Sequence, residues 1–241
     1  MYKRFLTATV AATVLTASLG ATAAMAETET TTTTDGRPTL EAARRRCTGG
    51  VNRRLAEMDR LEARVEDARH LTDEHESALS SMLTDTEAAL NELLGEIGSA
   101  TDGAALREHC GAVLEDHRVF VLRRPQVNLV IATDNGDAAV VELRERSEEI
   151  GARIDAAEGR GRDVTEARAV HDDLDANIDE VDEGLDGIAD TVLGFTPADY
   201  NENHDVLDPS REALKDVRTS LAAARADVRQ LRQLRRGAAT P

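Results

Sequence analysis

Apolar residues recur at alternating steps of three and four from Thr39 almost to the end of the chain. This spacing places them on one face of an α-helix, and its repeat over successive heptads is typical of helices that pack lengthwise against one another. The first apolar face carries Cys47, Val51, Met58, Leu61 and Val65. Further apolar faces lie within residues 79–97, 106–121, 140–154, 164–192 and 207–231. The pattern therefore predicts long amphipathic helices and an all-α fold.

Capping residues and glycines indicate where these helices begin and end. Asp73, followed by Glu76 three positions later, is similar to the capping box that opens a helix. Thr101-Asp102 begins the third helix, in which we expect Leu114 and Val121 to face inward. Gly159-Arg160-Gly161 is a helix-stop signal, after which Asp163 begins a fifth helix whose heptad spacing extends to Val192. Thr196-Pro197 and Asp208-Pro209 each combine a capping residue with a proline at a tolerated first position.

Short turns between helices of about 25 residues favour antiparallel packing. The chain length suits two three-helix, coiled-coil-like bundles in tandem, over residues 39–124 and 125–236, with a disordered tail at 237–241. The similar helix lengths of the two halves hint at a duplication, but no residue-level repeat accompanies it.

The segment from Arg118 to Thr133 allows two interpretations. Its β-branched residues and the turn around Pro125 are compatible with a strand, a turn and a second strand. A lone hairpin would be only marginally stable without a further strand, and none is evident. We therefore expect a connecting helix kinked at Pro125, and a further bend or break at Asn135-Gly136.

The N-terminus has the features of an export signal. Lys3 and Arg4 precede an apolar stretch that closes with Ala24-Met25-Ala26, so residues 1–26 are predicted to be a cleaved signal peptide. The threonine-rich residues 27–38 are too polar to bury and are predicted to be a disordered linker, with O-linked glycosylation as an open alternative. The protein is therefore expected to be secreted or associated with the cell envelope, with no stable membrane span after cleavage.

Cys47 and Cys110 are the only cysteines in the chain. Export exposes thiols to an oxidising compartment, where an even cysteine count most simply gives a disulfide. In an up-down-up bundle the first and third helices run parallel, and counting along them leaves the two cysteines about five residues, or roughly 8 Å, from level. We therefore predict a Cys47–Cys110 disulfide that contributes about 4 kcal/mol through loop entropy.

Composition excludes several classes of partner. The chain carries a net charge of −17, and loss of Lys3 and Arg4 with the signal peptide would make it −19. Nucleic acid is therefore not an expected partner. Beyond the signal peptide the aromatic residues are Phe120, Phe195 and Tyr200, too few to form a stacking surface for bases or sugars.

Acidic residues between Asp172 and Asp190 are interleaved with an intact apolar face. Carboxylates suit Ca²⁺, but a calcium-binding loop needs glycine at its sixth position, and counting from Asp173 that position is Ile178. A solvated helix face is the interpretation that we favour.

His70, Asp73 and His75 are the candidate metal ligands, because imidazole and carboxylate groups together suit zinc. A helix boundary falls between the two histidines, so a shared helical face is not guaranteed, and we expect neither a metal nor a cofactor.

Basic residues form a stripe near the C-terminus. This arginine stripe consists of Arg225, Arg229, Arg232, Arg235 and Arg236. It could bind anionic envelope polymers or lipid headgroups. The simpler explanation is favourable charge at a helix C-terminus, together with pairing to the acidic fifth helix.

Several short segments resemble an uncharacterised group of exported, all-helical actinobacterial proteins. They are Arg46-Cys47, Leu71-Thr72-Asp73, Cys110, the segment 118–122, Pro125 and Thr196-Pro197-Ala198-Asp199-Tyr200, whereas Asn135-Gly136 departs from that group. The resemblance implies an exported location and a helical fold, and no activity.

No nucleophile, base and orienting group can be assembled from the sequence, so no catalytic residue and no enzyme activity are predicted. The expected function is that of a non-enzymatic, exported helical scaffold, spacer or partner-binding protein at or outside the cell envelope. Its helical faces could recruit another protein, and the oligomeric state stays open. The alternative function is binding of a metal ion or an anionic envelope ligand.

Overall fold

The computed structural model of the protein describes residues 39–237, which are helical and contain no strand. The predicted signal peptide and threonine-rich linker lie outside the described residues, as do residues 238–241. Gly237, expected in the tail, is the last residue of the final helix. The predicted all-α fold of long packed helices is confirmed within this range, and the hairpin alternative is wrong.

Three long helices and a short one form the first half of the described chain and lead into the longest helix. These are α1 (Leu40–Glu66), α2 (Asp73–Ser99), α3 (Gly103–Glu115), the π-helix η1 (Val119–Arg123) and α4 (Arg124–Glu158). The second half then contains α5 (Thr165–Leu185), α6 (Ile188–Gly194), α7 (Pro197–Glu202) and α8 (Asp208–Gly237).

Helices α1, α2 and α3 pack on one another as a first bundle. Its helices begin where short polar side chains accept otherwise unsatisfied backbone N–H groups. Thr72 Oγ1 accepts from His75 N at 3.2 Å, so the cap of α2 is Thr72 rather than the expected Asp73. Asp102 caps α3, as predicted, by accepting from the amides of Ala104 and Ala105.

Cys47 and Cys110 form a disulfide between α1 and α3, with their Cα atoms 5.6 Å apart. Both cysteines lie on faces that pack against the bundle core. The pairing predicted from the parallel course of the first and third helices is thus confirmed.

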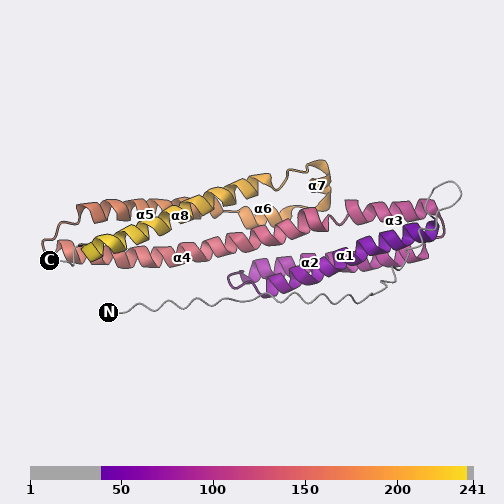
Figure 1. The fold of residues 1–241 in the computed structure, drawn as a ribbon, viewed down its shortest axis with the longest axis horizontal. Coiled ribbons are helices and arrows are strands. Elements are labelled where there is room, and N and C mark those ends of the chain that lie inside the picture. Colours follow the sequence, from indigo (N-terminus) through magenta and orange to yellow (C-terminus); the bar gives the residue numbers. More distant parts are fainter. Residues whose placement is uncertain (1–38, 238–241) are drawn as a thin grey trace, which may run out of the picture.

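The connection between the two halves differs from the expected kink at Pro125. The chain breaks earlier, at Arg118, which has a left-handed backbone with φ 38° and ψ 34°. The π-helix η1 then leads directly into α4, and Pro125 occupies the first turn of that helix. Proline has no backbone N–H, and it is tolerated in the first turn of a helix for that reason. Figure 1 shows α3 and α4 lying end to end across this connection.

Two predicted core positions of the third apolar face are exposed. Leu114 is 56% exposed and Val121 is 41% exposed, although both fit the helical spacing of the third apolar face. Because α3 ends at Glu115 and the chain turns at Arg118, the helical register is not continuous from one residue to the other.

The second bundle consists mainly of α4, α5 and α8, with α6 packed against α4. The apolar face predicted for the fifth helix is buried at Leu174, Ile178, Val181 and Val192. The helix itself is broken, because Gly187 adopts φ 65° between α5 and α6. This left-handed conformation is easily adopted by glycine, which has no Cβ.

The expected break at Asn135-Gly136 is wrong, since both residues lie inside α4. Asn135 Nδ2 donates to the carbonyl of Ile131, one turn earlier, at 2.7 Å. Gly136 is buried where α4 approaches Leu185 of α5, and a Cβ built on it would lie 2.8 Å from Leu185 Cδ2. A close helix approach, and not a turn, therefore accounts for this glycine.

The two halves contact each other over several elements and give an elongated body (Figure 1). Helix α1 contacts η1 and α4, α2 contacts α6, and α3 contacts α7. Gln126 is fully buried at the start of α4, where its Nε2 donates to the carbonyls of Val192 and Phe195 at 2.7 and 2.8 Å.

Candidate functional site

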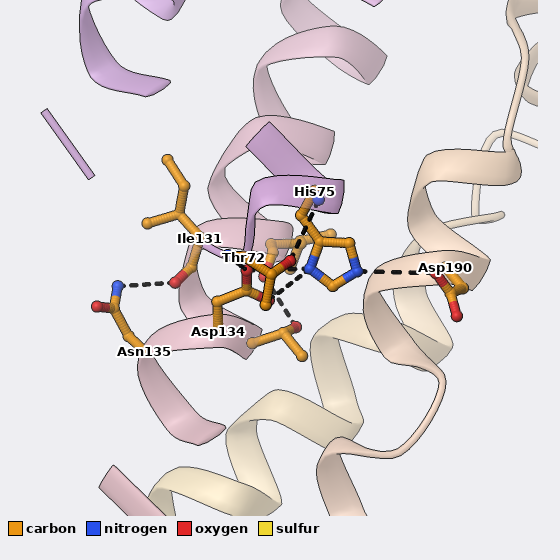
Figure 2. Close-up of polar contacts among 8 residues, drawn as sticks. Thr72, His75, Ile131, Asp134, Asn135 and Asp190 are labelled. Atoms are coloured by element: carbon orange, nitrogen blue, oxygen red, sulfur yellow. Dashed lines mark hydrogen bonds and ion pairs between the residues drawn. The ribbon is translucent and has the colours of Figure 1, made fainter. Parts of the chain in front are cut away.

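The joint between the two halves is built around a buried carboxylate. Asp134 of α4 has a side chain that is 1% exposed, and its Oδ1 lies 2.7 Å from Nδ1 of His75 at the start of α2. Its Oδ2 accepts the backbone N–H of Thr72 at 2.8 Å. Figure 2 shows these groups converging from α2 and α4. We call Thr72, His75 and Asp134 the α2–α4 joint.

Local structure explains why the joint forms at this point. The Thr72 amide precedes the first turn of α2, so no carbonyl of that helix is available to it. Asp134 supplies the acceptor, while the hydroxyl of the same Thr72 caps the helix. A buried carboxylate is costly unless it accepts hydrogen bonds, and here it accepts from both the amide and the imidazole.

Two further carboxylates lie around His75. Asp190 of α6 is 3.7 Å from His75 Nε2 and its side chain is 81% exposed, so the imidazole bridges α4 and α6 (Figure 2). Desolvation raises the pKa of Asp137, and the neighbouring charges of Asp134 and Asp182 raise it further, whereas His75 opposes this shift. Acidic groups thus outnumber the histidine at the joint.

The three metal-ligand candidates have different surroundings. His75 belongs to the joint, whereas His70 and Asp73 are exposed near the α1–α2 turn. Over the range 39–237, no group of three or more histidine, cysteine, aspartate or glutamate residues is arranged to hold a metal ion.

A second polar cluster, unforeseen in the sequence, ties α4 to α5. Ser147 Oγ lies 3.0 Å from His171 Nε2 and donates to Asp175 Oδ1 at 2.5 Å. His171 Nδ1 is 3.5 Å from Asp175 Oδ2. These residue types are those of a serine-hydrolase triad, so their hydrogen-bonding geometry decides what the cluster can do.

That geometry differs from the geometry needed for nucleophilic attack. His171 Nε2 lies 2.9 Å from the Ser147 carbonyl, which can only accept, so this nitrogen carries the proton and cannot take one from the hydroxyl. Ser147 is also only 3% exposed, in the interior of α4, where the neighbouring amides are used by the helix and cannot form an oxyanion hole. The arrangement suits a structural link between helices.

The arginine stripe lies on α8, and all five of its side chains are exposed. Arg225, Arg229, Arg232 and Arg235 form no ion pair with any residue in the described part of the chain. The expected pairing of these four with the acidic fifth helix is therefore wrong. The acids of α5 have nearer partners, since Arg144 of α4 binds Asp179 and Asp182 at 3.2 and 2.9 Å.

Sequence reasoning missed Asp134 and Ser147, although both positions carried a signal. Asp134 follows Val130 by four residues, and Ser147 lies four residues after Leu143, so both stand on the apolar face of α4. A polar residue at a core position needs a buried partner. The signal was present, but the partner could not be named without the packing.

Comparisons with protein-family models, with curated proteins and with solved structures found no match for this chain. Within residues 39–237, no helix has the length and apolar character needed to span a membrane.

Proposed function

We propose that the protein is a non-enzymatic, exported helical spacer or scaffold that holds a partner protein at or outside the cell envelope. The observation that carries this proposal is the α2–α4 joint. It links residues that are 59 positions apart and fixes the start of α2 on the first third of α4. A buried link of this kind favours one fixed arrangement of the two halves, which a spacer requires.

The disulfide supports the same function. The Cys47–Cys110 bond restrains α1 and α3 within the first bundle, in addition to the joint that links the two halves. Covalent restraint is typical of domains that must persist in an oxidising environment. A spacer outside the cell would benefit from that persistence.

The polar clusters also favour a non-enzymatic function. The Ser147, His171 and Asp175 groups satisfy one another between α4 and α5, and the serine is buried. At the joint, carboxylates surround one histidine and the Thr72 hydroxyl is used to cap α2. Both clusters use their polar groups to connect helices.

Partner contact is proposed at the end of α3 and at η1. Leu114, Phe120 and Val121 are large apolar residues that are 56%, 40% and 41% exposed. Arg54 of α1, which is itself buried, lies against the Phe120 ring at 5.4 Å from its centroid and supports the ring through a cation–π contact. Aromatic side chains are common anchors in protein interfaces.

The test is crosslinking on native cells followed by mapping of the crosslinked peptides. We expect crosslinks from the α3–η1 region to another protein, and we expect them to be lost in Leu114→Ser/Val121→Ser. Val141→Ser is the matched control, because Val141 is also exposed, at 59%, but lies on α4. Recovery of the protein as an uncrosslinked monomer would rule the proposal out.

A further inference from the structure

The open end of the second bundle contains an apolar cavity of about 380 Å³. It lies between the last turns of α4, the start of α5 and the last turns of α8, which Figure 1 shows meeting at one end of the molecule. Its apolar walls include Ile150 and Ile154 from α4, Val164 before α5, and Leu231 and Leu234 from α8. The volume falls within the range of small-molecule sites.

Small side chains explain why this end of the bundle is not filled. Ala157 continues the apolar face of α4 after Ile154, and Ala167 faces it from the first turn of α5. Deeper in the same bundle, the corresponding face of α5 carries Leu174 and Ile178, which are buried. Two alanines at the end of a face that elsewhere holds larger side chains leave room for an apolar group.

The rim of the cavity is basic, in contrast to the acidic chain. Arg162, Arg232 and Arg235 line it, and none of them forms an ion pair with a residue in the described range. Arg153 is also at the rim but is bound to Glu149 at 3.3 Å. The arginine stripe thus contributes two of its members to one site.

The acidic groups at the rim do not neutralise these arginines. Asp163 Oδ1 accepts from the backbone N–H and the hydroxyl of Thr165, at 3.0 and 2.8 Å, so its carboxylate binds within its own turn and not to a rim arginine. Glu166 lines the cavity without bonding to any of the rim arginines. Positive charge is therefore available beside an apolar space.

We propose that this cavity binds a single-chain amphiphilic anion, with the acyl chain between Ile154 and Leu231 and the carboxylate or phosphate head on Arg162, Arg232 and Arg235. The walls remove the chain from water. The guanidinium groups match an oxyanion through paired N–H donors. A neutral apolar molecule would leave these arginines without a counter-charge.

Charge also argues against a second copy of the chain at this end. A symmetric dimer would bring the same surface of each protomer together and so bring two basic rims close to each other. The inference does not depend on the spacer function, because the cavity is formed by α4, α5 and α8, whereas the proposed partner contacts lie on α3 and η1.

The test is a binding titration with a fluorescent polyene fatty acid, kept below its micelle concentration. The methyl ester of the same acid is the matched neutral probe, and a lysophospholipid with an anionic head, used as a competitor, distinguishes a phosphate head from a carboxylate. We expect saturable binding of one fatty acid per chain and at least tenfold weaker binding of the ester.

Variants separate the cavity from its charged rim. Arg162→Gln/Arg232→Gln/Arg235→Gln should weaken binding of the acid at least tenfold and leave binding of the ester unchanged. Ala157→Leu/Ala167→Leu should abolish binding of both probes by filling the space, with helical content checked by circular dichroism. The control is Arg225→Gln/Arg229→Gln, on the same helix but away from the cavity, which should bind as the wild type does.

Four results would overturn the inference. The first is the absence of saturable binding, and the second is equal affinity for the acid and its ester. The third is dimerisation through this end of the bundle that sedimentation detects and that added fatty acid does not reduce. Binding to anionic vesicles without binding of the monomeric acid would show a surface contact and would also overturn it.

Discussion

Nδ1 of His75 and Oδ1 of Asp134 lie 2.7 Å apart, although 59 residues separate them in the chain. Asp134 is nearly inaccessible to solvent, whereas the other carboxylate near this histidine, Asp190, is largely exposed. The two interactions therefore contribute differently. A buried hydrogen-bonded carboxylate leaves its partners unsatisfied when it is removed, while an exposed ion pair is largely replaced by water.

Asp134→Ala should lower the free energy of unfolding by about 2 to 3 kcal/mol, because the Thr72 amide and the imidazole would lose a buried acceptor. Asp190→Ala is the matched control and should leave stability unchanged. Urea denaturation followed by circular dichroism measures both. Equal effects of the two substitutions would contradict a buried joint.

Asp137 should make the protein less stable as the pH rises. Desolvation, followed by the charges of Asp134 and Asp182, raises its pKa above the ordinary 3.8, so the folded state holds the proton to a higher pH than the unfolded state does. Stability is then lost as the pH rises from 3.8 through the raised pKa. Because Asp137 is exposed to solvent, which screens its charge, Asp137→Asn should raise the melting temperature at pH 7 only slightly, and the gain should disappear below pH 3.8.

Asp163 provides a control of opposite sign for that measurement. Hydrogen bonds from Thr165 lower its pKa below 3.8, so it stabilises the fold at neutral pH and loses this effect as the pH falls through the lowered pKa. Asp163→Asn should lower the melting temperature at pH 7. Shifts of the same sign in the two variants would contradict this assignment.

Removal of the disulfide should destabilise the first bundle. The bond closes a segment with a sequence separation of 63, for which loop entropy predicts a loss of about 4 kcal/mol in Cys47→Ala/Cys110→Ala. Reductant should destabilise the wild type by a similar amount and have no effect on the double variant. Free thiols in mass spectra of the native protein would contradict the pairing.

Two glycines should respond to alanine with opposite signs. Gly136→Ala places a Cβ against Leu185, which is only 3% exposed, and should lower the free energy of unfolding by about 1 kcal/mol. Gly95 lies in α2 with nothing within 4 Å of an added Cβ. Gly95→Ala should therefore raise stability by about 0.5 to 1 kcal/mol through helix propensity. Thermal and urea denaturation measure both, and a stabilising Gly136→Ala would contradict the close approach of α4 to α5.

Local sequence signals predicted the helix ends that depend on a single helix turn. The caps at Asp102 and Thr196 and the stop at Gly159 act through hydrogen bonds to their immediate neighbours, so they could be identified in the sequence. The Cys47–Cys110 pair was predictable because a regular rise along parallel helices determines the level of each cysteine.

Local signals of the same kind led to wrong predictions where contacts between helices determine the structure. Asn135-Gly136 is a turn sequence that lies inside α4, because the glycine lets α5 approach. Leu114 was expected in the core but is exposed, because it follows the buried Val113 by one residue and so lies about 100° around α3 from it. Gly187 breaks a heptad pattern that continues on both sides of it.

The helical periodicity, several of the caps and the cysteine pairing could be predicted from the sequence alone, because they depend on residues close in the chain or on regular helix geometry. The contacts of Asp134 with His75 and of Ser147 with His171, and the position of Arg162 and Arg235 at one cavity, became evident only from the packed helices. These contacts are between different helices, so they depend on which helix faces pack together and on the position of one helix along the axis of the other. The periodicity of a single helix does not determine either of these.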